Sequence, residues 1–123
     1  MSAVHIYHNP RCSKSRQTLA LLQENGITPE ICLYLESPPS ADQLAILAAQ
    51  LGMTPRQFLR KGEAEYKAHG LGDEGLADSE VLAIMAANPK LIERPIVVKD
   101  GRAVLGRPPE NVLGLISAPV QSG

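Results

Sequence analysis

The chain has 123 residues, of which 44% are apolar and 20% are charged, and this composition excludes a wholly disordered chain, a collagen and a coiled coil. Apolar runs such as residues 96–98 are far shorter than the about 20 residues that a bilayer span needs, so no membrane helix is expected. A net charge of -1 and an aromatic content of 3% without Trp argue against a nucleic-acid partner.

The first third of the chain is predicted to form a strand, a helix and a second strand. Residues 4–7 alternate in polarity and end at the turn of residues 9–10. The helix that follows carries leucines among polar residues, and Gly26 is its expected C-terminal cap. Residues 30–35 are the second strand, which the segment 37–39, with its two prolines, brings to an end.

The middle third is predicted to be helical. Residues 40–43 and 54–57 are capping-box patterns that start two helices, and Gly52 ends the first of them. The polar stretch 61–75 is expected to hold short helical turns, and Asp78 is expected to cap a further helix.

Strands return in the final third. Residues 95–98 and 103–106 are predicted strands, and the Asp100-Gly101 pair between them is a strong hairpin signal. Residues 108–110 open a last helix.

The order of elements is therefore β-α-β, a helical block, then β-β-α. This is the plan of an α/β protein with a thioredoxin-like fold and a mixed four-stranded sheet. We predict a single thioredoxin-like domain over residues 1–116, with a helical insertion at about 40–88 between its two halves. Residues 117–123 are expected to be a C-terminal tail.

Cys12 is the strongest candidate for chemistry. It is expected at or just before the N-terminus of the first helix, where backbone amides and the helix dipole favour a thiolate. Its neighbours are polar, unlike those of a cysteine that fills space in a core. Four nearby side chains add positive charge or a hydrogen-bond donor: Arg11, Lys14, Ser15 and Arg16. Of these, Arg16 lies one helical turn after Cys12 and is placed to face the sulfur. His8 lies four residues upstream, across the turn.

Other cysteine chemistries fit the sequence poorly. A phosphatase loop needs an arginine where Thr18 stands, and a dithiol motif needs a second cysteine where Ser15 stands. Turnover would therefore need an external thiol such as glutathione, with no bound cofactor. The three histidines and Cys12 make no familiar metal-ligand spacing, so no metal is expected. Cys32, in an apolar strand, is expected to pack in the core.

Three arginines lie in suggestive positions. Arg60 follows the second capping box, Arg94 precedes Pro95 and a buried strand, and Arg107 precedes two prolines. A planar guanidinium binds oxyanions through forked hydrogen bonds, although any one of these residues taken alone is more often a surface charge. In a thioredoxin-like fold, a cis proline lies opposite the active cysteine at the start of the third strand. Pro95, which starts the predicted strand 95–98, is placed for that role.

Several motifs, taken together in order, resemble the ArsC family of glutaredoxin-coupled arsenate reductases. The resemblance covers nearly the whole chain. It is carried by His8-Asn9-Pro10-x-Cys12-x-x-Ser15-Arg16-x-Thr18-Leu19, Leu33-Tyr34-Leu35-Glu36-x-Pro38-Pro39, Leu59-Arg60-Lys61, Glu65-Tyr66 with Gly70-Leu71, Asn88-Pro89-x-Leu91-Ile92-x-Arg94-Pro95-Ile96-Val97-Val98 and Gly106-Arg107-Pro108-Pro109-Glu110.

This resemblance implies a specific chemistry. The thiolate of Cys12 would attack arsenate, and glutathione and glutaredoxin would then reduce the adduct to arsenite. Residues His8, Ser15 and Arg16 would support the thiolate. The arginines Arg60, Arg94 and Arg107 would hold the oxyanion. The chain departs from the well-studied reductases of this class in its short C-terminal segment and in the bulkier, more basic residues around Cys12. In both features it looks more like a shorter, arsenate-reductase-like branch of the family.

Two other functions remain open at this stage. A monothiol oxidoreductase acting on glutathione mixed disulfides would need Cys12 but no oxyanion site. A redox-sensing transcription regulator that binds RNA polymerase belongs to the same superfamily, although Ser15 removes the second thiol of its switch. We expect a cytoplasmic protein, because residues 1–5 show no signal-peptide pattern. We also expect a monomer with no membrane partner.

Overall fold

The computed structural model describes residues 3–116, so the predicted tail at 117–123 lies outside the described residues. The chain divides into two compact units, one made of residues 1–33 and 94–123 and the other of residues 34–93. The first unit therefore joins the two ends of the described chain. The second holds the predicted helical insertion and a few residues on either side of it.

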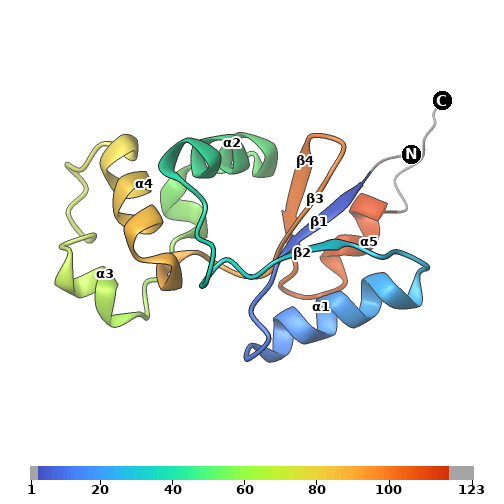
Figure 1. Ribbon diagram of the computed structural model, residues 1–123. Coiled ribbons are helices and arrows are strands. Elements are labelled where there is room, and N and C mark those ends of the chain that lie inside the picture. Colours follow the sequence, from blue (N-terminus) through green and yellow to red (C-terminus); the bar gives the residue numbers. More distant parts are fainter. Residues whose placement is uncertain (1–2, 117–123) are drawn as a thin grey trace. The chain divides into compact units, whose positions relative to one another are not determined.

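A mixed four-stranded sheet forms the first unit, in the order β2-β1-β3-β4 (Figure 1). Strand β1 (Val4–Tyr7) is parallel to β2 (Glu30–Cys32) and antiparallel to β3 (Ile96–Lys99), which pairs antiparallel with β4 (Arg102–Leu105). This confirms the predicted α/β, thioredoxin-like order β-α-β followed by β-β-α. The two late strands each lie within one residue of their predicted bounds.

The hairpin between β3 and β4 has the turn that its sequence predicts. Lys99 pairs with Arg102, which leaves a loop of the two residues Asp100 and Gly101. Both residues have positive φ angles, 54° and 75°, as a type I′ turn requires.

Helices α1 (Ser13–Glu24) and α5 (Asn111–Ile116) cover the sheet of the first unit. Their apolar side chains join those of β1 and β3 in one buried cluster, which contains Val4, Ile6, Leu22, Val97, Val112 and Leu115. Helix α1 ends as predicted, with Gly26 at a φ of 77° and its N–H bonded to the Gln23 carbonyl. The aliphatic cluster anchors α1, and with it the loop that precedes the helix.

Strand β2 is shorter than predicted. It stops at Cys32, and Tyr34 to Glu36 form a turn. It lies at the edge of the sheet, where Ile31 is 49% exposed and Cys32 is only partly buried. The apolar sequence suggested a core strand, but an edge strand with one neighbour leaves half of its backbone and part of its side chains open to water.

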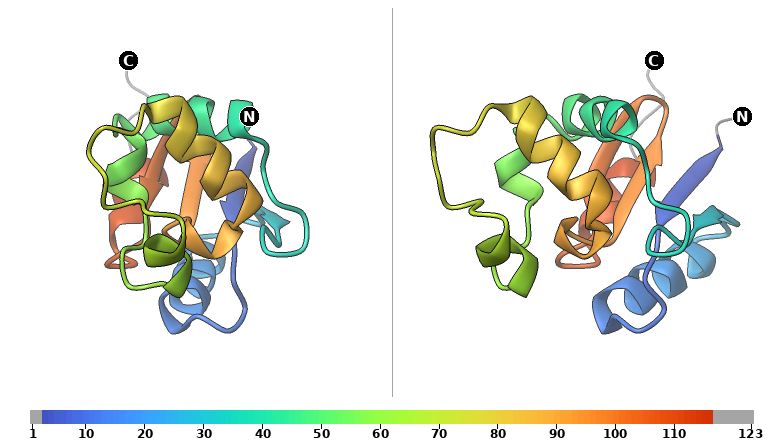
Figure 2. Two further views of the ribbon diagram at one scale, coloured as in Figure 1. Left: turned by 90° about the vertical axis from the view of Figure 1, so that its left-hand side faces the viewer. Right: turned by 60° about the vertical axis from the view of Figure 1, so that its left-hand side comes forward.

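The second unit is helical (Figure 2). It contains α2 (Ala41–Leu51), η1 (Pro55–Phe58), α3 (Ala64–Ala68), α4 (Asp78–Ala87) and η2 (Pro89–Leu91). The predicted capping box at Ser40 is complete, since Ser40 Oγ accepts the Gln43 N–H and Gln43 Oε1 accepts the Ser40 N–H. At Thr54 the Gln57 half is formed, since Gln57 Oε1 accepts the Thr54 N–H, whereas the Gln57 N–H donates to the Thr54 carbonyl.

The start of α4 differs by one residue from its prediction. Ala77, not Asp78, is the N-cap, and Glu80 Oε1 accepts the Ala77 N–H. No helix among residues 3–116 is long and apolar enough to cross a membrane.

Candidate functional site: a cysteine at a helix N-terminus

Cys12 is the N-cap residue of α1, as predicted. Its backbone is extended, with φ -95° and ψ 123°, and its carbonyl accepts the Arg16 N–H at 3.0 Å to start the helix. The Cys12 N–H donates to the Asn9 carbonyl at 3.0 Å, which closes the turn between β1 and the helix. The sulfur therefore lies where the first backbone N–H groups of α1 have no helical acceptor.

The pKa of the Cys12 thiol is lower than that of an ordinary thiol. Partial burial alone would raise this pKa, because it disfavours the charged sulfur. Burial is outweighed by the backbone N–H groups of Ser15 and Lys14 and by the Arg94 guanidinium, all of which hydrogen-bond to the sulfur. Arg94 also adds its positive charge at short range. The site is therefore built to hold a thiolate.

His8 and Ser15 form a buried pair within the loop that precedes α1. His8 Nδ1 lies 2.6 Å from Ser15 Oγ, which also accepts the Asn9 N–H at 3.0 Å. His8 is 6% exposed and Ser15 is fully buried. The Ser15 hydroxyl therefore contacts the loop, and Ser15 supports the thiolate through its backbone N–H instead.

Arg16 lies on the exposed side of the same helical turn. Its Nη1 donates to the Pro10 carbonyl at 2.9 Å, so it ties the loop to the helix. The pKa of His8 is lowered, first by burial of the imidazole and then by the positive charge of Arg16. Arg94, and not Arg16, is the cation that hydrogen-bonds to the sulfur. The charge of Arg16 instead lowers the pKa of His8.

The segment before β3 brings Arg94 to the sulfur. The Arg94-Pro95 peptide bond is cis, as the fold suggested, and the Arg107-Pro108 bond is also cis, which the sequence did not indicate. Arg107 Nη1 donates to the Arg94 carbonyl at 3.5 Å, a long contact on the surface. Two of the three predicted oxyanion arginines thus lie close together in the first unit.

Arg60, the third predicted oxyanion arginine, belongs to the second unit. Its Nη1 donates to Glu93 Oε1 at 2.6 Å and its Nε donates to Glu63 Oε2 at 3.2 Å. Its guanidinium is therefore paired with two carboxylates of its own unit.

Cys32 is not the core residue that its sequence context predicted. Its side chain is partly exposed, and burial raises the pKa of its thiol. It pairs across the strands with Tyr7, whose pKa is raised by burial and then by the nearby Cys32. The two cysteines are thus opposite in acidity.

Comparison with known proteins identifies the family. The model of the ArsC family matches residues 7–115. The chain belongs to the ArsC family.

Several relatives are similar over nearly the full length of this ArsC protein. "Arsenate reductase" of Haemophilus influenzae is 44% identical over 115 residues, which are 93% of this chain and 99% of that protein. "Uncharacterized protein YfgD" of Escherichia coli K12 is 53% identical over 114 residues, 92% of this chain and 96% of its own. The solved structure of "Arsenate reductase from Vibrio cholerae" superposes with a TM-score of 0.88 at 54% identity and covers 90% of this chain and 95% of its own.

Two residues that support the site of this ArsC protein were not singled out from the sequence. Thr18 is fully buried, and its single Oγ1–H is shared between the Lys14 carbonyl, at 2.8 Å, and the Gly106 carbonyl, at 3.2 Å. A Cβ at Gly106 would lie 2.6 Å from Thr18 Oγ1 and 2.8 Å from the Pro95 ring. A glycine at the end of a strand signals such a close approach, and Thr18 lies one turn after Ser15 on the same face of α1.

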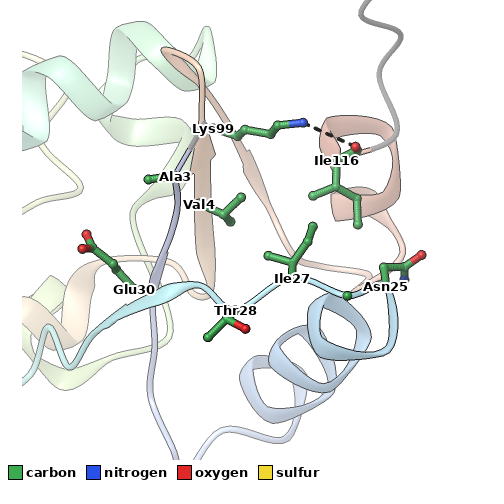
Figure 3. A pocket seen from close by; sticks show the side chains of 9 residues that line it. Ala3, Val4, Asn25, Ile27, Thr28, Glu30, Lys99 and Ile116 are labelled. Atoms are coloured by element: carbon green, nitrogen blue, oxygen red, sulfur yellow. Dashed lines mark hydrogen bonds between the residues drawn. The ribbon is translucent and has the colours of Figure 1, made fainter. Parts of the chain in front are cut away.

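A cavity of about 470 Å³ in the first unit lies away from the thiol (Figure 3). It is lined by the start of β1, the residues that follow α1, and Lys99 at the end of β3, whose Nζ donates to the Ile116 carbonyl at 3.4 Å. Cys12 is at the opposite end of α1. Among residues 3–116, no group of three or more His, Cys, Asp or Glu side chains is arranged to hold a metal ion.

Proposed function

We propose that this chain reduces arsenate to arsenite with Cys12 as its nucleophile. The observation that carries the proposal is the Cys12 sulfur at the N-terminus of α1, with a pKa lowered by two backbone amides and the Arg94 guanidinium. A thiolate is the reactive form of a cysteine, and a neighbouring cation also attracts an oxyanion. Relatives named arsenate reductase that align with nearly the whole chain support the same substrate.

In the proposed first step, the Cys12 thiolate attacks arsenic and forms a sulfur–arsenic bond. One arsenate oxygen takes up protons from the medium and leaves as water. The Arg94 and Arg107 guanidinium groups of the first unit would stabilise the negative charge of the remaining oxygens. Arg60 would assist to the extent that its two carboxylates leave it available.

Two external thiols would then supply the electrons. A glutathione thiol replaces a second oxygen on arsenic, which again leaves as water. A glutaredoxin thiolate attacks the glutathione sulfur, the arsenic–glutathione bond breaks, and its electron pair stays on arsenic, which becomes trivalent. Water then releases arsenite from Cys12 and restores the thiol, while glutaredoxin and glutathione leave as a mixed disulfide. The reductant is glutathione, and no bound cofactor is needed.

The supporting residues have distinct proposed roles. His8 and Ser15 would fix the loop that carries the thiolate, and the Ser15 N–H would stabilise its charge directly. Arg16 would hold the loop through the Pro10 carbonyl. Pro95 would set the direction of Arg94. Because glutathione and glutaredoxin are cytoplasmic reductants, we place the reaction in the cytoplasm, with the chain acting as a monomer.

The test is NADPH oxidation coupled through glutathione reductase, glutathione and glutaredoxin, with and without arsenate. We expect arsenate-dependent turnover that Cys12→Ser abolishes, because an alcohol stays protonated at neutral pH. Cys32→Ser is the matched control and should keep turnover, since its thiol lies on the edge strand with a raised pKa.

Other outcomes would redirect the function. Turnover of glutathione mixed disulfides without arsenate dependence would make the chain a monothiol oxidoreductase. Binding to RNA polymerase without turnover would make it a regulator. Arsenate turnover that survives in Cys12→Ser would refute the proposed nucleophile.

A further inference from the structure

The charged residues of the first unit are sorted between the two ends of its sheet. Strand β1 runs from Val4, which pairs with Lys99 beside the hairpin turn, to Tyr7, which pairs with Ile96. The end near Tyr7 therefore carries the Cys12 loop, the first turn of α1, and the segments before β3 and after β4. The charged side chains in these segments are Arg11, Lys14, Arg16, Arg94, Arg107 and Glu110. This end of the unit is strongly basic.

At the opposite end of the sheet the two signs of charge nearly balance. The charged residues there lie at the end of α1, at the start of β2 and around the hairpin turn, and they are Glu24, Glu30, Lys99, Asp100 and Arg102. The net charge of -1 for the whole chain hides this separation. The basic end of the first unit is the end that carries the reactive thiol.

The side chains of Arg11 and Lys14 flank Cys12 in the chain and are not used by the thiol. Arg11 is exposed and Lys14 is partly exposed. Neither forms an ion pair with a carboxylate in the described part of the first unit. The pKa of Cys12 is lowered by Arg94 and by backbone N–H groups, and not by these two side chains. Their charges are therefore open to a binding partner.

The backbone holds the two cations in fixed places beside the sulfur. The Arg11 N–H donates to Asn9 Oδ1 at 3.0 Å, and the Lys14 carbonyl accepts the Thr18 hydroxyl at 2.8 Å. A surface that is already ordered loses little conformational entropy when a partner binds. Because Cys12 is partly exposed between them in the chain, a protein that reaches its sulfur must approach both cations.

Resting on the proposed function, we propose that Arg11 and Lys14 form a docking surface for the reductant protein, and that this partner presents a negatively charged face around its own reactive thiol. Opposite charges speed the encounter of two proteins and orient them. Solvated charges act over a Debye length of about 10 Å, which suits the broad face of a protein, whereas a small oxyanion needs direct hydrogen bonds.

The test uses the mixed disulfide of Cys12 with glutathione, made from the Cys32→Ser chain and glutathione disulfide. A glutaredoxin thiolate attacks the glutathione sulfur, the disulfide bond breaks, and Cys12 leaves as a thiolate, while glutaredoxin keeps the glutathione as a new mixed disulfide. The rate is followed by acid quenching and mass spectrometry, with one glutaredoxin of net negative charge and one of net positive charge. No arsenate is present, so the assay is independent of arsenate reduction.

We expect Arg11→Gln/Lys14→Gln to slow reduction by the negatively charged glutaredoxin about three- to tenfold at an ionic strength of about 0.02 M. The difference should disappear at about 0.5 M salt, where screening is strong. With the positively charged glutaredoxin, the same variant should react faster than the wild type. Each single variant should give part of the effect, and either one replaces the double variant if the latter fails to fold by circular dichroism.

Three controls separate docking from other effects. Lys99→Gln/Arg102→Gln removes the same charge from the other end of the sheet and should leave both rates unchanged. Dithiothreitol, a small uncharged reductant, should reduce the mixed disulfide of Arg11→Gln/Lys14→Gln at the wild-type rate. Alkylation of the free Cys12 thiol by neutral iodoacetamide should also be unchanged, because the two side chains do not set its pKa.

The outcomes separate the two proposals. Unchanged rates in Arg11→Gln/Lys14→Gln, equal losses with both glutaredoxins or with dithiothreitol, or no reduction by either glutaredoxin would overturn the docking surface. A fall in alkylation by anionic iodoacetate, with unchanged glutaredoxin rates, would assign the two cations to small anions instead. A charge-dependent glutaredoxin rate in a chain that never turns over arsenate would keep the docking surface and refute the proposed arsenate reduction.

Discussion

His8 Nδ1 lies 2.6 Å from Ser15 Oγ, and both side chains are buried between β1 and the first turn of α1. The pair ties the end of the strand to the helix whose N-cap is Cys12. The pair therefore stabilises the conformation of the loop that carries Cys12, and its loss should lower the free energy of unfolding.

The first prediction concerns the pH dependence of stability. Burial and then the charge of Arg16 lower the pKa of His8 in the folded chain, whereas a histidine in the unfolded chain has a pKa of about 6.5. The unfolded state therefore takes up a proton first as the pH falls. The free energy of unfolding gained from a neutral His8 is complete above about pH 6.5 and is lost as the pH falls toward the folded pKa.

Urea unfolding at pH 7.5 and at pH 5.5 measures this effect. The loss of stability on acidification should be smaller in His8→Gln than in the wild type. His69→Gln, at an exposed histidine, should keep the wild-type difference. An equal loss in wild type and His8→Gln would show that other groups cause it.

The second prediction separates the side chain of Ser15 from its backbone. Ser15→Ala removes the partner of His8 Nδ1 and of the Asn9 N–H, so the free energy of unfolding should fall by about 1–3 kcal/mol. The Ser15 N–H remains, and the pKa of Cys12 should stay low, as measured by alkylation rate against pH. Ser13→Ala, at the exposed first residue of α1, should change neither quantity appreciably. A raised Cys12 pKa in Ser15→Ala would mean that the hydroxyl itself stabilises the thiolate.

Local patterns predicted the fold well because each is decided by neighbouring residues. The capping box at Ser40, the left-handed Gly26 and the Asp100-Gly101 turn all depend on a few successive residues. The sequence therefore predicts these three features, and with them the order of the elements. The edge position of β2 depends on which strands pair, so the exposure of Cys32 was beyond the reach of its own apolar neighbours.

The candidate site was predictable in residue type but not in partner. Cys12 at the helix N-terminus follows from the turn and helix pattern around it. That Arg94 rather than Arg16 hydrogen-bonds to the sulfur follows from the sheet, which brings together two segments that lie far apart in the sequence. Likewise, no local pattern pairs Arg60 with Glu93, since the contact joins the residues after η1 to the segment before β3.

The third prediction concerns Arg94. Its guanidinium hydrogen-bonds to the Cys12 sulfur and adds positive charge, so Arg94→Gln should raise the pKa of Cys12. At neutral pH the thiolate fraction and the alkylation rate fall, and kcat/KM for arsenate should fall by about 100-fold if Arg94 also stabilises the oxyanion. Cys32, whose pKa is raised by burial, is the internal reference and should react at an unchanged rate.

Arg102→Gln is the matched control for Arg94, because Arg102 is an exposed arginine of the same unit at the hairpin turn. It should leave the alkylation profile of Cys12 unchanged. An unaltered profile in Arg94→Gln would leave the backbone amides as the whole cause of the thiol acidity.

The last prediction concerns the close approach of Gly106 to α1. A Cβ at this position would lie 2.6 Å from Thr18 Oγ1 and 2.8 Å from Pro95 Cγ, closer than real contacts allow. Neither atom yields easily, since Thr18 is buried with its hydroxyl within hydrogen-bond distance of two backbone carbonyls, and Pro95 is a rigid ring just before β3. Gly106→Ala should therefore lower the free energy of unfolding by about 1–3 kcal/mol.

The same substitution should also act on the thiol. Pushing Pro95 away from α1 moves Arg94 relative to the sulfur, so the pKa of Cys12 should rise in Gly106→Ala. Gly114→Ala is the control, because a Cβ there meets nothing within 4 Å, and an alanine in α5 should raise stability by about 0.5–1 kcal/mol. A Gly106→Ala protein with wild-type stability and an equally acidic Cys12 would show that the close approach of Gly106 to Thr18 and Pro95 does not hold Arg94 in place.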